Sequence, residues 1–291
     1  MRQEQITRER IEAMIRRSPR RWRLRDGWDA LPSPTSDAHD QALRFPFPET
    51  FGNLCNESCP VRTIGVRVDS RGRAYTYLRC SDDDLDSVRA WIDTIGAFIA
   101  TRDCLALSFA LDYDREDGDP SKPQTKIGRL RSQAKPYGKT PTKANYEAAY
   151  ELAAECIEFL RSMPCYDTID VIVPMPPSSP DKCYSLPAVL AERIAGETGV
   201  PWVEAARTVS AREQMKNISL DDKLRELDGT IRIDASSVQG KTVLLLDDLY
   251  QSGVSMNYVG MLLVEAGATA VLGLAVEKTC RNDDNLGGRQ P

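Results

Sequence analysis

Four consecutive apolar residues, Val243–Leu246, run directly into two acids, Asp247 and Asp248. A segment that is apolar on both faces belongs in the middle of a parallel sheet, because helices cover both faces of such a sheet. Two ionised carboxylates at the end of a buried strand cost free energy unless something satisfies them. Since α/β proteins bind ligands at the carboxyl ends of their strands, the segment predicts a central strand that brings two acids to a ligand site.

The residues that follow the acids have the composition of a phosphate-binding loop. The loop consists of Gln251, Ser252, Gly253, Val254 and Ser255, and a helix is expected over 255–266. Free backbone N–H groups, hydroxyl donors and the positive end of a helix all favour one phosphate at such a loop. Two carboxylates beside that phosphate suit the hydroxyls of a ribose, so the segment predicts a ribose-5-phosphate site. The structural alternative is a strand–turn–helix with solvated acids.

An apolar strand followed by two acids also occurs at the magnesium site of P-loop ATPases. That class requires a Gly-x4-Gly-Lys-Ser/Thr loop that opens a helix. Gly-Lys-Thr occurs at 138–140 and at 240–242, but position 133 is glutamine and position 235 is alanine. The first glycine is therefore missing from both copies, and we exclude an ATPase.

From about residue 104 the chain alternates between expected strands and expected helices. The strands are expected at 105–111, 169–174, 230–233, 243–246 and 271–276, and the helices at 143–161, 185–198 and 255–266. Repeated strand–helix–strand units form a parallel sheet with right-handed crossovers, so the expected class is α/β. The polar tract 114–142 is expected to be a mobile surface segment.

The first hundred residues have a different pattern. A basic helix is expected over 4–17, an irregular connector over 26–50, a hairpin over 61–79 and a helix over 85–101. We therefore divide the chain into a basic helical arm (1–30), a small α+β domain (31–103), the α/β domain (104–280) and a flexible tail (281–291).

The segment 243–256 resembles the phosphoribosyl-pyrophosphate motif of type I phosphoribosyltransferases: apolar strand, two acids, a Thr-Thr-Gly-type loop and a helix. Over about residues 105–280 the chain resembles the competence-protein-F-like, amidophosphoribosyltransferase-like branch of that family. This wider resemblance rests on Tyr113, Ile127–Lys135, Val171–Pro176, Arg207, Gln214, Gly229–Ile233 and Gly240–Val243. It implies a parallel-sheet type I phosphoribosyltransferase fold with a smaller α+β N-terminal region. It also implies transfer of a phosphoribosyl group from 5-phosphoribosyl-1-pyrophosphate (PRPP) to a nitrogenous acceptor.

The same resemblance implies roles for individual residues. Asp247 and Asp248 would hold the ribose hydroxyls and magnesium, and the loop Gln251–Ser255 would hold the 5-phosphate. The pyrophosphate would lie beside Met175, Pro176 and Lys182. A hairpin over 207–229 would close as a lid and bring Arg212 or Lys216 to the leaving group. For selection of the acceptor, Glu277 and Lys278, expected past the last strand, are the only candidates.

Two positions depart from the family pattern. Gln251 replaces the usual threonine of the phosphate loop. After Pro176 the family's arginine-rich stretch is replaced by Pro177–Ser185, in which Lys182 is the only cation. The second departure favours a non-catalytic sensor of PRPP or a nucleotide, whereas the acid pair and the hairpin fit an enzyme and a sensor alike. A third hypothesis is a component of a nucleic-acid-processing or defence assembly that contacts its partner through residues 1–100.

Charge and cysteine content add expectations about partners and location. Residues 1–25 hold nine arginines and three glutamates, although the chain's net charge is −5. Two interpretations stand side by side: a nucleic-acid or acidic-protein partner for this arm, and a solvated or intramolecularly paired helix. A homodimer is among the assemblies that the resemblance implies. Cys55, Cys59 and Cys80 lack the paired spacing of zinc knuckles, so buried thiols are favoured over a metal site. No apolar run is long enough to span a membrane and no signal peptide is evident, so a cytoplasmic location is expected.

Overall fold

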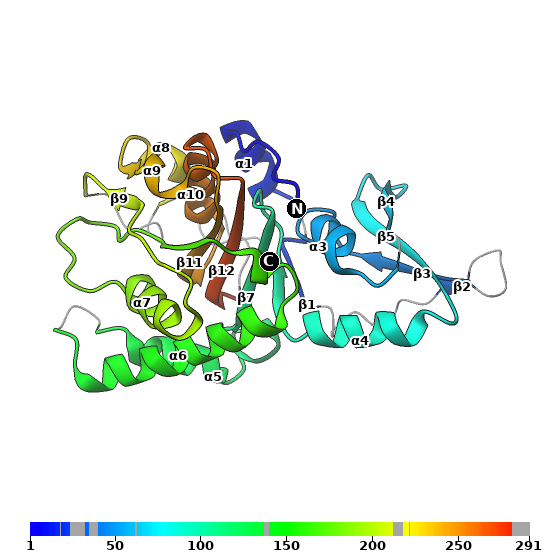
Figure 1. Ribbon diagram of the computed structural model, residues 1–291, viewed down its shortest axis with the longest axis horizontal. Helices are drawn as coiled ribbons and strands as arrows, with labels where there is room; N and C mark the ends of the chain where they lie inside the picture. Colours follow the sequence, from blue (N-terminus) through cyan, green and yellow to red (C-terminus); the bar gives the residue numbers. More distant parts are fainter. Residues whose placement is uncertain are drawn as a thin grey trace.

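The computed structural model describes residues 1–17, 19–23, 33–34, 40–61, 63–136, 140–211, 218–220 and 222–280. Its strands form a six-stranded sheet in the order β1-β6-β7-β12-β11-β8, a four-stranded sheet in the order β2-β3-β5-β4, and a small two-stranded sheet of β9 and β10. The two larger sheets lie side by side along the long axis of the molecule (Figure 1). Within the described residues, no helix is long and apolar enough to cross a membrane.

Four neighbouring strands of the six-stranded sheet run parallel. They are β7 (Leu107–Tyr113), β12 (Ala270–Lys278), β11 (Thr242–Tyr250) and β8 (Val171–Pro174). The short strands β6 (Ile99–Thr101) and β1 (Arg21–Arg23) extend the sheet, with β6 antiparallel to both of its neighbours. The expected α/β class with a mostly parallel central sheet is confirmed.

Helices cover both faces of this sheet, as its apolar strands require. Alternate residues of β11 point to opposite faces. Leu244 and Leu246 pack in the same core as α5 (Lys126–Ala134), α6 (Lys143–Ser162) and α7 (Leu186–Thr198). Val243 and Leu245 pack with α1 (Arg8–Ile15), α8 (Lys223–Leu227), α9 (Ala235–Val238) and α10 (Val254–Glu265). Figure 1 shows the first group of helices below the sheet and the second above it.

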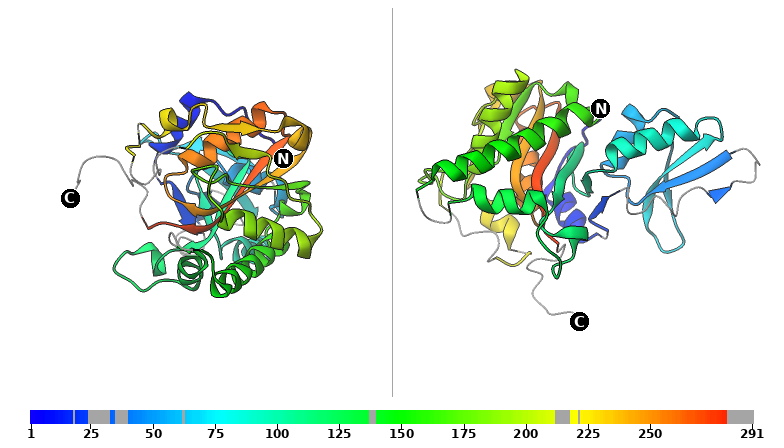
Figure 2. Two further views of the ribbon diagram at one scale, coloured as in Figure 1. Left: turned by 90° about the vertical axis from the view of Figure 1, so that its left-hand side faces the viewer. Right: turned by 90° about the horizontal axis from the view of Figure 1, so that it is seen from below.

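The four-stranded sheet is built from β2 (Ser33–Pro34), β3 (Asp40–Phe45), β5 (Ala74–Ser81) and β4 (Thr63–Val68). The expected hairpin over 61–79 corresponds to β4 and β5, which pair antiparallel. One face of the sheet packs against α3 (Phe51–Ser58) and α4 (Leu85–Ile95). The ring centroid of Phe45 lies 5.4 Å from that of Phe51 and 6.0 Å from that of Trp91, so all three elements share one core. Figure 2 shows how far this lobe projects from the larger sheet.

Three expectations about local structure are wrong. The helix expected over 85–101 ends at Ile95, where Gly96 follows, and 99–101 form β6. The expected connector 26–50 contains β3, whose Leu43 and Phe45 are fully buried. The expected mobile tract 114–142 contains α5, which is capped by Thr125 and buries Ile127, Leu130 and Ala134. In the connector and in the tract, buried apolar side chains stabilise structure that local polarity concealed; in the helix, apolar residues continue past Gly96 and so concealed where it ends.

The N-terminal helix lies against the α/β unit rather than extending from it. Helix α1 buries Ile11, Met14 and Ile15 and packs near α10. Arg8 forms an ion pair of 2.7 Å with Asp228, and Arg23 forms one with Asp112. These two arginines of the basic arm are therefore paired within the chain, as the alternative to an external partner predicts. The expected tail 281–291 lies outside the described residues.

Candidate functional site

The neighbouring strands β8 and β11 are followed by helices on opposite faces of the sheet. After β8 the chain continues to α7 on one face, and after β11 it continues to α10 on the other. Ligands of open α/β sheets bind in the crevice at such a switch point. A cavity of about 1140 Å³ opens there. Its location agrees with the edge that the sequence predicts.

The cavity gathers almost all of the site residues expected from the sequence. It is lined by Met175, Pro176, Lys182, Asp247, Asp248, Gln251, Ser252, Gly253, Val254 and Ser255. Lys182 is exposed at the rim. The lid residues Arg212 and Lys216 lie outside the described residues. The structure also adds three cations to the walls that received no role from the sequence: Arg131, Lys135 and Lys223.

The two acids lie within β11, which continues to Tyr250 rather than ending at Leu246. Asp247 Oδ1 accepts a hydrogen bond of 2.8 Å from the backbone N–H of Asp248. Burial, and then the neighbouring charge of Asp248, raise the pKa of Asp247. Burial and like-charge repulsion both disfavour the ionised form, so this carboxyl is costly to keep charged without a ligand.

Helix α5 and the residue that follows it supply cations to the second acid. Lys135 forms an ion pair with Asp248, and Arg131 Nε lies 3.9 Å from Asp248 Oδ2. Arg131 Nη1 also donates to Glu277 Oε1 at 3.1 Å. Burial raises the pKa of Glu277 to about 7, although Arg131 opposes the shift. The stretch 127–135 contributes to the family resemblance, but only the fold shows that two of its three cations, Arg131 and Lys135, reach the acids.

Glu277 and Lys278 do not lie past the last strand, as expected, but within β12. The side chain of Lys278 is fully buried, and its Nζ donates to the backbone oxygen of Gln251 at 3.2 Å. Glu277 pairs with Arg131. Both side chains therefore contact residues of the cavity wall and do not cover the opening of the cavity.

The loop between β11 and α10 has the geometry of an anion site. Gly253 is the N-cap of α10 and has a φ of +76°. A Cβ at this position would overlap the hydroxyl of Tyr250 and lie 3.1 Å from Nη2 of Arg20, so only glycine fits. Backbone N–H groups at the start of a helix face outward to the loop and attract anions.

A buried lysine from α8 reinforces this loop. Lys223 is 1% exposed, and its Nζ donates to the Ser252 hydroxyl at 3.2 Å. A buried ammonium group requires a nearby acceptor or anion, because desolvation disfavours its charge. Ser252 is itself buried. Sequence reasoning missed Lys223, because the short helix that carries it follows a polar stretch with no motif.

Contacts from the N-terminal segment form the floor beneath the loop. Arg20 Nη2 donates to the Tyr250 hydroxyl at 3.4 Å, and this hydroxyl donates to Asp103 Oδ2 at 3.4 Å. Burial raises the pKa of Asp103 to about 6. The amide of Asn257 donates to Gly253 O at 2.8 Å. The position of the phosphate-type loop is therefore fixed by the residues beneath it and by Asn257 of α10.

The acid pair fits magnesium only with help from a ligand. Mg²⁺ commonly binds one or two protein carboxylates together with substrate phosphates and waters. Asp247 and Asp248 supply two carboxylates, and within the described residues no group of three or more potential metal ligands occurs. Phosphate oxygens of a bound substrate would have to complete the coordination.

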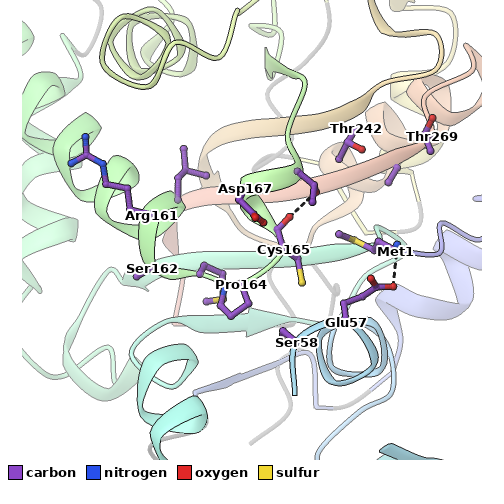
Figure 3. Close-up of a pocket in the computed structure, with 14 residues that line it drawn as sticks. Met1, Glu57, Ser58, Arg161, Ser162, Pro164, Cys165, Asp167, Thr242 and Thr269 are labelled. Carbon is purple, nitrogen blue, oxygen red and sulfur yellow. Dashed lines mark hydrogen bonds and ion pairs between the residues drawn. The ribbon is translucent and has the colours of Figure 1, made fainter. Parts of the chain in front are cut away.

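A second cavity, of about 580 Å³, lies at the opposite edge of the sheet, beside the first residues of β11 and β12 (Figure 3). The terminal ammonium group of Met1 forms an ion pair of 3.0 Å with Glu57 beside it. Neither the acid pair nor the glycine loop contributes to its walls. The cavity at the carboxyl ends of β8 and β11 is therefore the candidate site.

No family model and no curated protein matches the chain. Solved structures similar to it include adenine phosphoribosyltransferase from Saccharomyces cerevisiae, at 16% identity over 47% of this chain and 70% of that one, with a TM-score of 0.31. Hypoxanthine-guanine phosphoribosyltransferase of L. donovani is similar at 18% identity over 45% and 69%, with a TM-score of 0.28. The chain's own cavity must therefore support any assignment of function.

Proposed function

We propose that the cavity between β8 and β11 binds PRPP together with magnesium, and that the chain transfers the phosphoribosyl group to a nitrogenous acceptor. One observation carries the proposal: two adjacent carboxylates, a glycine loop at a helix N-terminus and a buried lysine line the same cavity at the switch point of the sheet. The carboxylates suit the hydroxyls of the ribose, and the loop and the lysine suit its 5-phosphate.

The 5-phosphate would lie at the loop 251–255. There the backbone N–H groups at the start of α10, the hydroxyls of Ser252 and Ser255 and the ammonium group of Lys223 all supply hydrogen bonds or positive charge. The ribose hydroxyls would donate to Asp247 and Asp248. Magnesium, when bound, would neutralise pyrophosphate.

Arg131 of α5 and Lys135, the residue after this helix, would replace the arginines missing after Pro176. In the unliganded chain Lys135 pairs with Asp248. A ribose hydroxyl that donates to Asp248 frees Lys135 to bind a pyrophosphate oxygen, and Arg131 lies beside it. The reaction itself breaks the bond between the anomeric carbon and pyrophosphate, while the acceptor nitrogen forms the new bond. Since the transition state has oxocarbenium character, the chain's residues would act by orienting the ribose, stabilising the leaving group and excluding water.

A sensor that binds PRPP or a nucleotide without turnover is the second candidate. The observation in its favour is the segment after β8, where Lys182 is exposed at the cavity rim rather than buried in a pyrophosphate loop. A sensor and an enzyme bind PRPP alike, so binding alone does not distinguish them.

The deciding experiment measures binding and turnover in parallel. Thermal melts with PRPP and magnesium test binding, because a ligand of the folded state raises the melting temperature. Release of pyrophosphate in the presence of a panel of bases and amines tests turnover. A raised melting temperature with release supports the enzyme, and the same rise without release supports the sensor. No rise with millimolar PRPP contradicts both.

A further inference from the structure

The four-stranded sheet has two chemically different faces. Along β5 the residues that point toward α3 and α4, Thr76, Leu78 and Cys80, are buried. Because side chains alternate along a strand, Tyr75, Tyr77 and Arg79 point to the opposite face. On the neighbouring strand β3, Leu43 and Phe45 are buried, so Arg44 lies on the same face as the two tyrosines.

Arginines and tyrosines on this face stack in pairs. The guanidinium carbon of Arg67, on β4, lies 4.6 Å from the ring centroid of Tyr77, and that of Arg44 lies 5.1 Å from the ring centroid of Tyr75. Arg44 and Arg67 are exposed, and both tyrosines are half-buried. We call Arg44, Arg67, Tyr75, Tyr77 and Arg79 the arginine–tyrosine face.

The described side chains of this face are basic, whereas the chain as a whole is acidic. Among the described side chains of β3, β4 and β5 that point to this side, three are arginines and none is acidic. The chain as a whole carries a net charge of −5. The hairpin at the end of the face adds exposed Arg71 and Arg73, of which Arg73 pairs with Asp69. A local excess of positive charge on an acidic chain points to a polyanionic partner.

We propose that the arginine–tyrosine face binds single-stranded nucleic acid. Arginines neutralise phosphates, and unpaired bases stack on aromatic rings and on guanidinium planes. Tyr75 and Tyr77 lie two residues apart on one strand, about 7 Å, so each arginine–tyrosine pair offers a separate stacking position for one base. A duplex keeps its base faces stacked internally and cannot use the rings. An acidic protein would contact the arginines but would gain nothing specific from the tyrosines.

The test is fluorescence anisotropy of the full chain with a labelled oligothymidylate or oligouridylate of about 12 nucleotides at low salt. Tyr75→Ala with Tyr77→Ala should weaken binding about thirtyfold or more, because stacking is lost at two positions. Arg44→Gln with Arg67→Gln should weaken binding and reduce the slope of log K against log salt by about 1.4, since two phosphate contacts are lost.

A matched control lies on α6. Arg193 of the neighbouring helix α7 is stacked 5.5 Å from the ring centroid of Tyr150 there, and Tyr150 is 48% exposed. Tyr150→Ala removes a similar pair outside the arginine–tyrosine face and should bind the oligonucleotide like the wild type. The melting-temperature rise caused by PRPP should be unchanged in all of these variants, which separates this proposal from the proposed function.

Three results would overturn the proposal. The first is that the wild-type chain binds neither oligonucleotide at low salt. The second is that the tyrosine variant binds as tightly as the wild type. The third is that a duplex of equal length or polyglutamate competes as well as the single strand, which would make the face a general electrostatic surface. If the alanine pair lowers the melting temperature, Tyr75→Leu with Tyr77→Leu retains the packing and should still lose the stacking.

Discussion

Replacement of Gly253 by alanine tests whether the loop is built as a phosphate site. An alanine at a φ of +76° costs about 1–2 kcal/mol from backbone strain alone. Its Cβ would also overlap the Tyr250 hydroxyl and lie 2.6 Å from Cζ of the same ring. Moving this buried ring breaks its hydrogen bonds to Arg20 and Asp103, which adds about 1–3 kcal/mol. Gly253→Ala should therefore lower the free energy of unfolding by about 2–5 kcal/mol.

Gly199 provides a matched control at the end of α7. Its φ is also +76°, but a Cβ there would meet nothing within 4 Å. Gly199→Ala should cost only the backbone strain of about 1–2 kcal/mol. Urea unfolding of both variants measures the difference, and thermal melts with PRPP and magnesium measure the loss of ligand stabilisation. The reasoning is refuted if the two variants unfold at the same urea concentration, or if Gly253→Ala retains the full ligand-induced rise.

Three further predictions concern charges around the cavity. Asp247→Asn should weaken PRPP binding roughly ten- to a hundredfold in calorimetry, because a charged acceptor is lost. Without PRPP the variant should melt at a higher temperature than the wild type, since it no longer has a carboxyl that is costly to bury. An affinity equal to that of the wild type would contradict the role of this acid. Lys223→Met retains the aliphatic stem and should reduce affinity for ribose 5-phosphate about tenfold or more, with an unchanged circular dichroism spectrum; equal affinity would place the phosphate elsewhere. Because the folded state raises the pKa of Glu277 from 4.5 to about 7, it retains a proton that the unfolded chain releases, so stability should fall as pH rises through this window. Glu277→Gln should flatten this part of the melting-temperature profile, and an identical profile would show that other groups cause the slope.

The candidate site could be predicted from the sequence where one short segment contains both the structure and the chemistry. Val243–Leu246 and the loop 251–255 lie within one short stretch of the sequence, so the strand, the turn and the start of the helix can be predicted together. Lys223 and Lys135 could not be placed in this way, because each reaches the cavity from an element far away in sequence. The role of Arg20 could not be predicted either, since an arginine within a basic run is expected to be solvated. In the structure it is buried against Tyr250.

The N-terminal lobe shows the opposite case. The hairpin of β4 and β5 was predictable from alternating residues on both sides of a glycine turn. Strand β3 was not, although Leu43 and Phe45 alternate correctly, because prolines and acids around it resemble a connector. A two-residue period over so few positions is a weak signal until a neighbouring strand completes the ladder.

The strand order β7-β12-β11-β8 places β12, the last strand among the described residues, in the middle of the sheet. During synthesis on the ribosome, β7, β8 and β11 emerge before the strand that joins β7 to β11 exists. The two halves of the sheet therefore present unpaired edges until Ala270–Lys278 inserts between them, and such edges attract other chains. A nascent or truncated chain that stops before Ala270 should depend on chaperones and should aggregate, and the phosphate-type loop would take its final position only after Ala270–Lys278 has left the ribosome.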